Sequence, residues 1–254
     1  MNRFDRMLRA DFLKIRRTPL LLIHLLLPLI GAGAFLAYAF ISPMDSLELT
    51  VGFVELLAVV FPTLIGVLTA ILARQEEAAG QFQNLLGGAA PKMWTFLSKL
   101  LLLLIMGFTG TLLAVVMFGA GLTELLHKDG LLPMHLYLNV TCVLAGSCII
   151  LYIFHLMISL RFGQGTSIGM GIMGSLLAAL LLTGLGDGIW ILVPWSWPVR
   201  LASMWVLYAT EVPLSASIMA QLQSGIWISI AVTAGVLLLS SAWFTRWEGR
   251  KSEG

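Results

Sequence analysis

Long apolar runs alternate with short polar segments along the whole chain. A helix needs about 20 apolar residues to cross the hydrocarbon core of a bilayer. By that measure the pattern predicts six membrane-spanning helices, at residues 19–41, 51–73, 97–121, 135–160, 165–184 and 224–245. We therefore expect an all-α polytopic membrane protein with one transmembrane domain that covers residues 1–254.

The segment before the first span, residues 1–18, has a pattern of its own. Phe4, Leu8, Phe12 and Ile15 recur at helical spacing, with arginine and lysine around them. Helices of this kind lie on a membrane surface, where anionic lipids attract the cations. The pattern predicts an amphipathic arm that anchors the chain and orients the first span, with a specific binding site as the alternative.

A cleaved signal peptide is a second interpretation of the N-terminal region. Ala32-Gly33-Ala34 resembles a cleavage site, but the apolar run continues to Ile41 and is longer than an ordinary signal core. Cleavage would also leave an odd number of spans and place the two termini on opposite faces. We therefore expect the first span to stay in the protein.

A polar insert at residues 74–96 separates the second and third spans. Its polarity must lie outside the bilayer, yet Phe82, Leu85 and Leu86 can form an apolar edge on a short helix. A short amphipathic helix on one membrane face is suited to contact a soluble protein. The insert therefore indicates a membrane subunit driven by a partner, with an ordinary solvated loop as the alternative.

The segment between the fifth and sixth spans, residues 185–223, is semi-apolar but interrupted by glycine and proline. Irregular backbone at membrane depth is stable only where protein covers it or where it lines water. We expect short re-entrant or surface helices here. Tryptophan is enriched at the headgroup level of membranes, so the same depth is expected for Trp190, Trp195, Trp197 and Trp205.

The basic residues are distributed very unevenly. Of the 15 lysines and arginines, only Lys128 and Arg200 lie outside the N-terminal arm, the region 74–99, the link between spans four and five, and the tail 246–254. Cytoplasmic segments of membrane proteins carry the excess of basic residues. The arm, the insert and both termini are therefore predicted to be cytoplasmic, and the segment 185–223 extracellular.

Composition agrees with a membrane protein, since 59% of the residues are hydrophobic and 11% are charged, against about 25% charged in soluble domains. The chain has no Gly-x-x-x-x-Gly-Lys-Ser/Thr loop and no His-Glu-x-x-His pair. The two cysteines, Cys142 and Cys148, are expected to be packing residues rather than metal ligands. We therefore expect no catalytic residue, metal site or bound cofactor in this chain.

Several segments carry a family resemblance, at residues 8–14, 17–19, 24–32, 76–86 and 194–198. With the six spans, they resemble the permease subunits of type-2 ABC exporters. More narrowly, the chain is similar to the lantibiotic-immunity permeases, the G-type subunit of two-permease immunity transporters. The resemblance covers nearly the whole sequence.

The resemblance implies that the insert is a coupling helix that enters a cleft of an ABC ATPase. Glu76 and Glu77 would lie near its start, where carboxylates suit the helix dipole and can meet basic residues of the ATPase. Gly80 would permit close approach, and Phe82, Leu85 and Leu86 would supply the apolar contact. Two ATPase copies would bind ATP and magnesium, beside a second, related permease or a second copy of this chain.

The implied function is export of a lantibiotic, an amphipathic peptide antibiotic, from the bacterial cytoplasmic membrane to the outside, which protects the producing cell. The expected partners are this peptide and membrane lipid, without nucleic acid. Within the spans, Glu55 and His24 are candidates for the substrate path, together with the tryptophans of 185–223. Alternatives are an exporter of another hydrophobic cargo, such as a lipid or another peptide or drug, and a sensor or intramembrane enzyme without transport.

Overall fold

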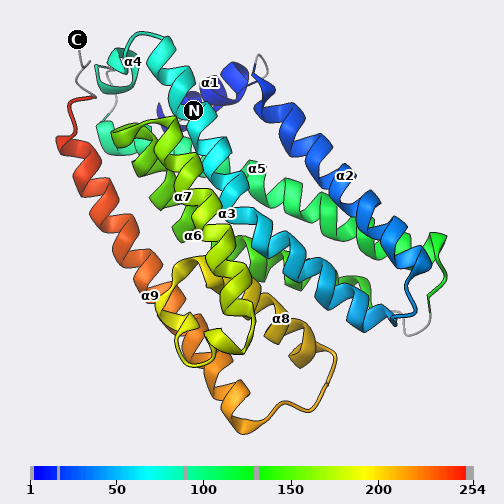
Figure 1. Ribbon diagram of the computed structural model, residues 1–254. Coiled ribbons are helices and arrows are strands. Elements are labelled where there is room, and N and C mark those ends of the chain that lie inside the picture. Colours follow the sequence, from blue (N-terminus) through cyan, green and yellow to red (C-terminus); the bar gives the residue numbers. More distant parts are fainter. Residues whose placement is uncertain (1–2, 16–17, 88–90, 129–131, 250–254) are drawn as a thin grey trace.

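The computed structural model describes residues 3–15, 18–87, 91–128 and 132–249, and all regular structure in these ranges is helical (Figure 1). The fold class expected from the sequence is confirmed. The α-helices are α1 (Arg3–Ile15), α2 (Pro19–Ile41), α3 (Ser46–Ala78), α4 (Gln83–Leu86), α5 (Lys92–Ala120), α6 (Met134–Phe162), α7 (Gln164–Leu182), α8 (Trp197–Ala209) and α9 (Ala216–Arg246). A π-helical turn η1 (Gly121–Leu125) continues α5, and three 3₁₀ turns precede α8: η2 (Gly184–Gly186), η3 (Trp190–Leu192) and η4 (Pro194–Ser196).

Six of these helices, within the described residues, are long and apolar enough to cross a membrane: α2, α3, α5 with η1, α6, α7 and α9. The first span has the predicted bounds, while α3 and α9 extend well beyond theirs. Both extensions start at side-chain caps. Asp45 accepts a hydrogen bond from the Glu48 N–H in a capping box, and Ser215 accepts one from the Ile218 N–H.

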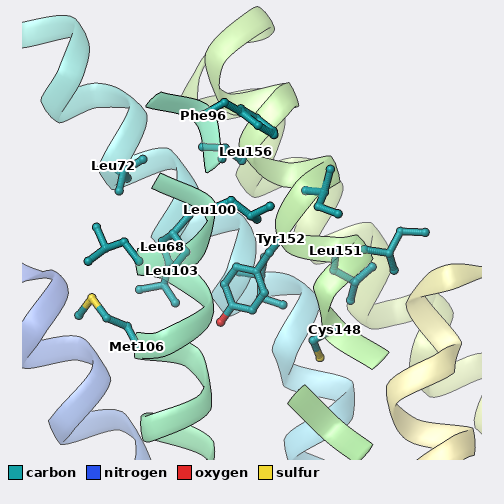
Figure 2. Packing of buried hydrophobic residues seen from close by; sticks show 14 of the residues in the cluster. Leu68, Leu72, Phe96, Leu100, Leu103, Met106, Cys148, Leu151, Tyr152 and Leu156 are labelled. Carbon is teal, nitrogen blue, oxygen red and sulfur yellow. The ribbon is translucent and has the colours of Figure 1, made fainter. Parts of the chain in front are cut away.

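The helix α3 occupies the centre of the bundle and packs most closely on α7. A Cβ atom at Gly66 would lie 2.7 Å from the Ser167 carbonyl oxygen, and one at Gly171 only 2.6 Å from the Pro62 carbonyl oxygen. Small residues of this kind let membrane helices approach closely. Figure 2 shows part of the core on the other side of α3, with Leu68 and Leu72 of α3, Leu100, Leu103 and Met106 of α5, and Cys148, Leu151, Tyr152 and Leu156 of α6.

The helix α2 lies at the edge of the bundle beside α5 (Figure 1). Its outer face exposes large apolar side chains, among them Leu22, Ile30 and Phe40. An apolar surface at membrane depth is solvated by lipid tails, so this exposure fits the predicted span.

The bundle has two ends that differ in composition. We call the end with α1, α4 and the last turn of α9 the arm end (Figure 1), and the end with η1, the 3₁₀ turns and α8 the loop end. Six spans bring the first and the last described helices to the same end. This arrangement agrees with the distribution of basic residues. That the arm end faces the cytoplasm stays a prediction.

The segment between the fifth and sixth spans forms short helices, as expected, but α8 packs into the bundle against α3, α6 and α9. Protein covers two of the four tryptophans of this segment, and their expected depth at the headgroup level stays a prediction. Trp190 and Trp197 are 0% and 2% exposed, because protein covers them, while Trp195 and Trp205 are half-buried.

Candidate coupling site and substrate path

At the arm end, α1 is docked on α5 rather than lying apart from the bundle. Phe4 contacts Trp94 edge-on with ring centroids 5.7 Å apart. Ile15 is buried, whereas Phe12 on the same predicted stripe is exposed. The arm is thus part of the folded bundle.

A buried ionic cluster joins three helices at this end. Lys99 of α5 donates to Asp11 of α1 at 2.5 Å and to Glu76 of α3 at 2.5 Å. Ser98 donates to the second Asp11 oxygen at 2.6 Å, and Lys14 donates to Glu76 at 3.2 Å. We call these five residues the arm cluster.

The central groups of the arm cluster are almost inaccessible, with Asp11, Glu76 and Lys99 exposed by 7%, 2% and 5%. A buried charge is strongly unfavourable unless an opposite charge and hydrogen bonds satisfy it. Two carboxylates and two ammonium groups meet this condition here. The cluster therefore holds α1, α3 and α5 in one arrangement.

The structure corrects the expected position of the two glutamates. Glu76 and Glu77 lie in the last turn of α3, not at the start of a short helix. The C-terminal end of a helix disfavours carboxylates, so the proposed benefit from the dipole is absent. The two ammonium groups of the arm cluster compensate Glu76, and Glu77 is half-buried.

The insert continues as a tight turn and then α4. Gly80, Gln81 and Phe82 all adopt left-handed backbone, with φ of 123°, 52° and 65°. This conformation is strained for residues other than glycine. The turn places Phe82 inside the bundle, where the centroid of its ring lies 5.2 Å from that of Trp247.

The apolar edge predicted for the coupling helix thus packs against the chain itself. Phe82 and Leu85 are 1% and 4% exposed, and Leu86 is half-buried. Lys92 adds a hydrogen bond of 3.1 Å to the Trp247 carbonyl oxygen. The outward surface is formed instead by other parts of the insert: Arg74, Ala78, Ala79, Gly80, Gln81, Gln83 and Gly87.

At the loop end, Glu55 of α3 is half-buried beside Ser203 and within electrostatic range of Arg200. Arg200 donates to the carbonyl oxygens of Leu181 and Thr183, each at 2.7 Å, and to Asp187 at 2.9 Å. Basic side chains commonly satisfy the last carbonyls of a helix in this way. Arg200 therefore joins the end of α7 to α8.

The four tryptophans of the loop end have separate environments. Trp190 donates to Gln221 at 3.1 Å, and Trp197 donates to the Ile191 carbonyl oxygen at 2.9 Å. Trp195 covers Gly174, where a Cβ atom would lie 2.2 Å from its ring. These three side chains hold η3 and η4 on the bundle. Trp205 lies on α8, two residues after Ser203, the hydrogen-bond partner of Glu55.

The sequence comparison identifies the family of this bundle. A family model described as ABC-2 family transporter protein matches residues 7–173. The chain belongs to the ABC-2 transporter family. Neither a curated protein nor a solved structure matches it.

As an ABC-2 permease, the chain is a non-catalytic, multi-pass membrane component of a transporter, and such permeases pair with ABC ATPase subunits. The broader part of the resemblance is thereby confirmed. The roles assigned to Glu76, Glu77, Gly80, Phe82, Leu85 and Leu86 in coupling, and to Glu55 and the tryptophans in the substrate path, stay predictions.

Sequence reasoning on this permease missed the arm cluster. The signals were the two aspartates of an otherwise basic arm, Asp5 and Asp11, and a lysine, Lys99, at the start of a long apolar run. It also missed a polar network between α3, α6 and α7. There His155 Nδ1 lies 3.2 Å from the Ser167 hydroxyl, and Thr69 lies 3.2 Å from Ser167 and 3.1 Å from Ser159.

Proposed function

We propose that this permease couples ATP hydrolysis by two copies of an ABC ATPase to export of a lantibiotic from the cytoplasmic membrane. A second, related permease or a second copy of the chain would complete the transporter. The observation that carries the coupling part is the arm cluster, because Glu76 ties the exposed turn after α3 to both α1 and α5. The cargo is proposed from the sequence resemblance to immunity permeases.

The polar surface of the insert is the proposed ATPase contact. The buried side chains Phe82 and Leu85 position this surface instead of entering the ATPase cleft themselves. Gln83 is exposed on α4, next to the left-handed turn. A partner that moves this turn acts directly on the end of α3, since only Ala79 to Phe82 separate the two helices.

Cysteine cross-linking tests the contact in the complete transporter. The background variant carries Cys142→Ser and Cys148→Ala, and Gln83→Cys is added at the arm end. Leu185→Cys, also exposed but at the loop end, is the matched control. We expect cross-links to the ATPase from position 83 only, and modification of that position by an impermeant maleimide only in opened cells. Cross-links from position 185 alone would refute the proposed contact.

The cargo is tested by survival of a sensitive host. The chain is expressed with the ATPase and permease encoded beside it and exposed to purified lantibiotics. We expect protection that is lost when the ATPase cannot hydrolyse ATP. Equal sensitivity with and without the transporter, at verified expression, would favour the alternative of another hydrophobic cargo.

A further inference from the structure

An apolar cavity of about 190 Å³ lies between the central parts of α2, α3, α5 and α6. Its walls include Leu27, Leu56, Val60, Leu64, Phe108 and Ala145. The cavity belongs neither to the arm cluster nor to the loop end. At the cavity, α2 packs closely on α5, whereas α2 contacts α3 only slightly.

The cavity is partly open toward the outer surface of the bundle. Four of its wall residues, Leu27, Leu56, Val60 and Phe108, are also more than a third exposed. They come from three different spans, so this surface faces the hydrocarbon of the bilayer rather than water. The opening therefore connects the cavity to lipid tails.

The polar groups of the wall are few, and the Nε2 atom of His24 is buried without a hydrogen-bond partner among the described residues. Thr111 donates to the Gly107 carbonyl oxygen at 2.8 Å, and His24 Nδ1 lies 2.8 Å from the Leu20 carbonyl oxygen. Apolar cavities of about 150 Å³ stay dry and accept small hydrocarbons. The wall thus offers water too few partners and offers hydrocarbon a continuous apolar surface.

We propose that this cavity binds the aliphatic chain of a membrane lipid. Its size is below the range of about 300–1,000 Å³ typical of sites for drug-sized ligands, so it accepts a slender chain and excludes a helix of a partner protein. Lipid tails are the solvent at this depth and reach the opening without crossing protein. The bound chain would separate α2 from α3. The proposal needs only the membrane location of the permease and does not depend on its cargo.

Two glycines of α2 provide a matched pair of variants. A Cβ atom at Gly31 or at Gly33 would meet nothing within 4 Å. Gly31 lines the cavity, whereas Gly33 does not. Gly31→Leu should therefore fill the cavity without a backbone clash, and Gly33→Leu adds the same side chain outside it.

The probe is phosphatidylglycerol with a photoreactive diazirine in the middle of one acyl chain, mixed into phosphatidylglycerol vesicles that contain the full chain. Cys148 and Tyr152 of α6, both labelled in Figure 2, line the cavity and are only 2% and 6% exposed. After irradiation we expect lipid adducts on these two residues. Gly31→Leu should lower their yield about tenfold, equivalent to about 1.4 kcal/mol of binding free energy, and Gly33→Leu should leave it unchanged.

A second probe requires no variant. The same lipid with its diazirine at the headgroup should not label Cys148 or Tyr152, because the proposal places only the chain in the cavity. The proposal is overturned if lipid adducts form only on exposed side chains. It is also overturned if Cys148 and Tyr152 are labelled equally in the two glycine variants, or equally by the two probes.

Discussion

Replacing Lys99 with methionine should destabilise the permease strongly. The variant keeps most of the apolar stem of Lys99 but removes the only charge that contacts both Asp11 and Glu76 within the described structure. Removing one partner of a buried ion pair typically costs about 3–5 kcal/mol. We expect a cost at the lower end of this range, because Ser98 still donates to Asp11 and Lys14 still donates to Glu76.

We therefore expect the free energy of unfolding to fall by about 3 kcal/mol. The measurement is reversible unfolding in mixed micelles, followed by helical circular dichroism. Lys92→Met is the matched control, because Lys92 is half-buried at the start of the same helix and donates to one carbonyl oxygen. Loss of this single hydrogen bond should lower the free energy of unfolding by about 1 kcal/mol.

A neutral version of the cluster separates charge from packing. Combining Asp11→Asn, Glu76→Gln and Lys99→Met leaves no buried charge among these three positions. Stability should recover part of the loss, because no buried carboxylate is then left without its opposite charge. The reasoning fails if Lys99→Met unfolds like the unmodified chain, or if the neutral variant is no more stable than Lys99→Met alone.

Three further predictions concern other parts of the permease. Phe82→Ala should cost about 3–5 kcal/mol and expose the turn after α3 to limited proteolysis, because the ring packs on Trp247; unchanged proteolysis would contradict its packing role. Arg200→Ala should cost about 2–3 kcal/mol through two lost charged hydrogen bonds to the carbonyl oxygens of Leu181 and Thr183 at the end of α7, whereas Asp187→Ala, at an exposed partner, should cost less than about 1 kcal/mol in the same unfolding assay. The purified chain should release no phosphate from ATP, and turnover in a preparation verified free of ATPase subunits would refute its assignment as a non-catalytic subunit.

The limits of the spans show what the sequence could predict. The first span was predicted at its structural bounds, because Pro19 favours a helix start and Pro43 follows its end. The fourth span shifted by only one or two residues, whereas the third begins five residues before and ends four residues after its predicted bounds. The second was predicted too short, since hydropathy ignores the capping box of Asp45 and Glu48, which was itself readable in the sequence.

The direction of individual side chains was not predictable in the same way. Polarity alone placed Glu76 on the surface, but its partner Lys99 lies 23 residues away on another helix. The apolar character of Phe82 suited a partner's cleft as well as the chain's own core. Trp190 and Trp197 fit a surface belt in composition, and only the packing of η3 and α8 shows that protein covers them. Each of these choices depends on tertiary contacts that no local pattern encodes.

The arm cluster and the apolar cavity involve the same two spans. The cluster fixes the arm-end positions of α3 and α5, and the cavity walls lie farther along these helices. The helix α3 runs without a break from the arm cluster to the cavity walls at Leu64 and Leu68. A displacement of the turn at Gly80 would therefore move this part of α3 relative to α2, which contacts α3 little. We therefore expect ATPase engagement at the arm end to change the width of the α2–α3 opening. Lipid-chain labelling of Cys148 should then differ between the nucleotide-free and the ATP-bound transporter, while labelling of Leu22, on the outer face of α2, should stay constant.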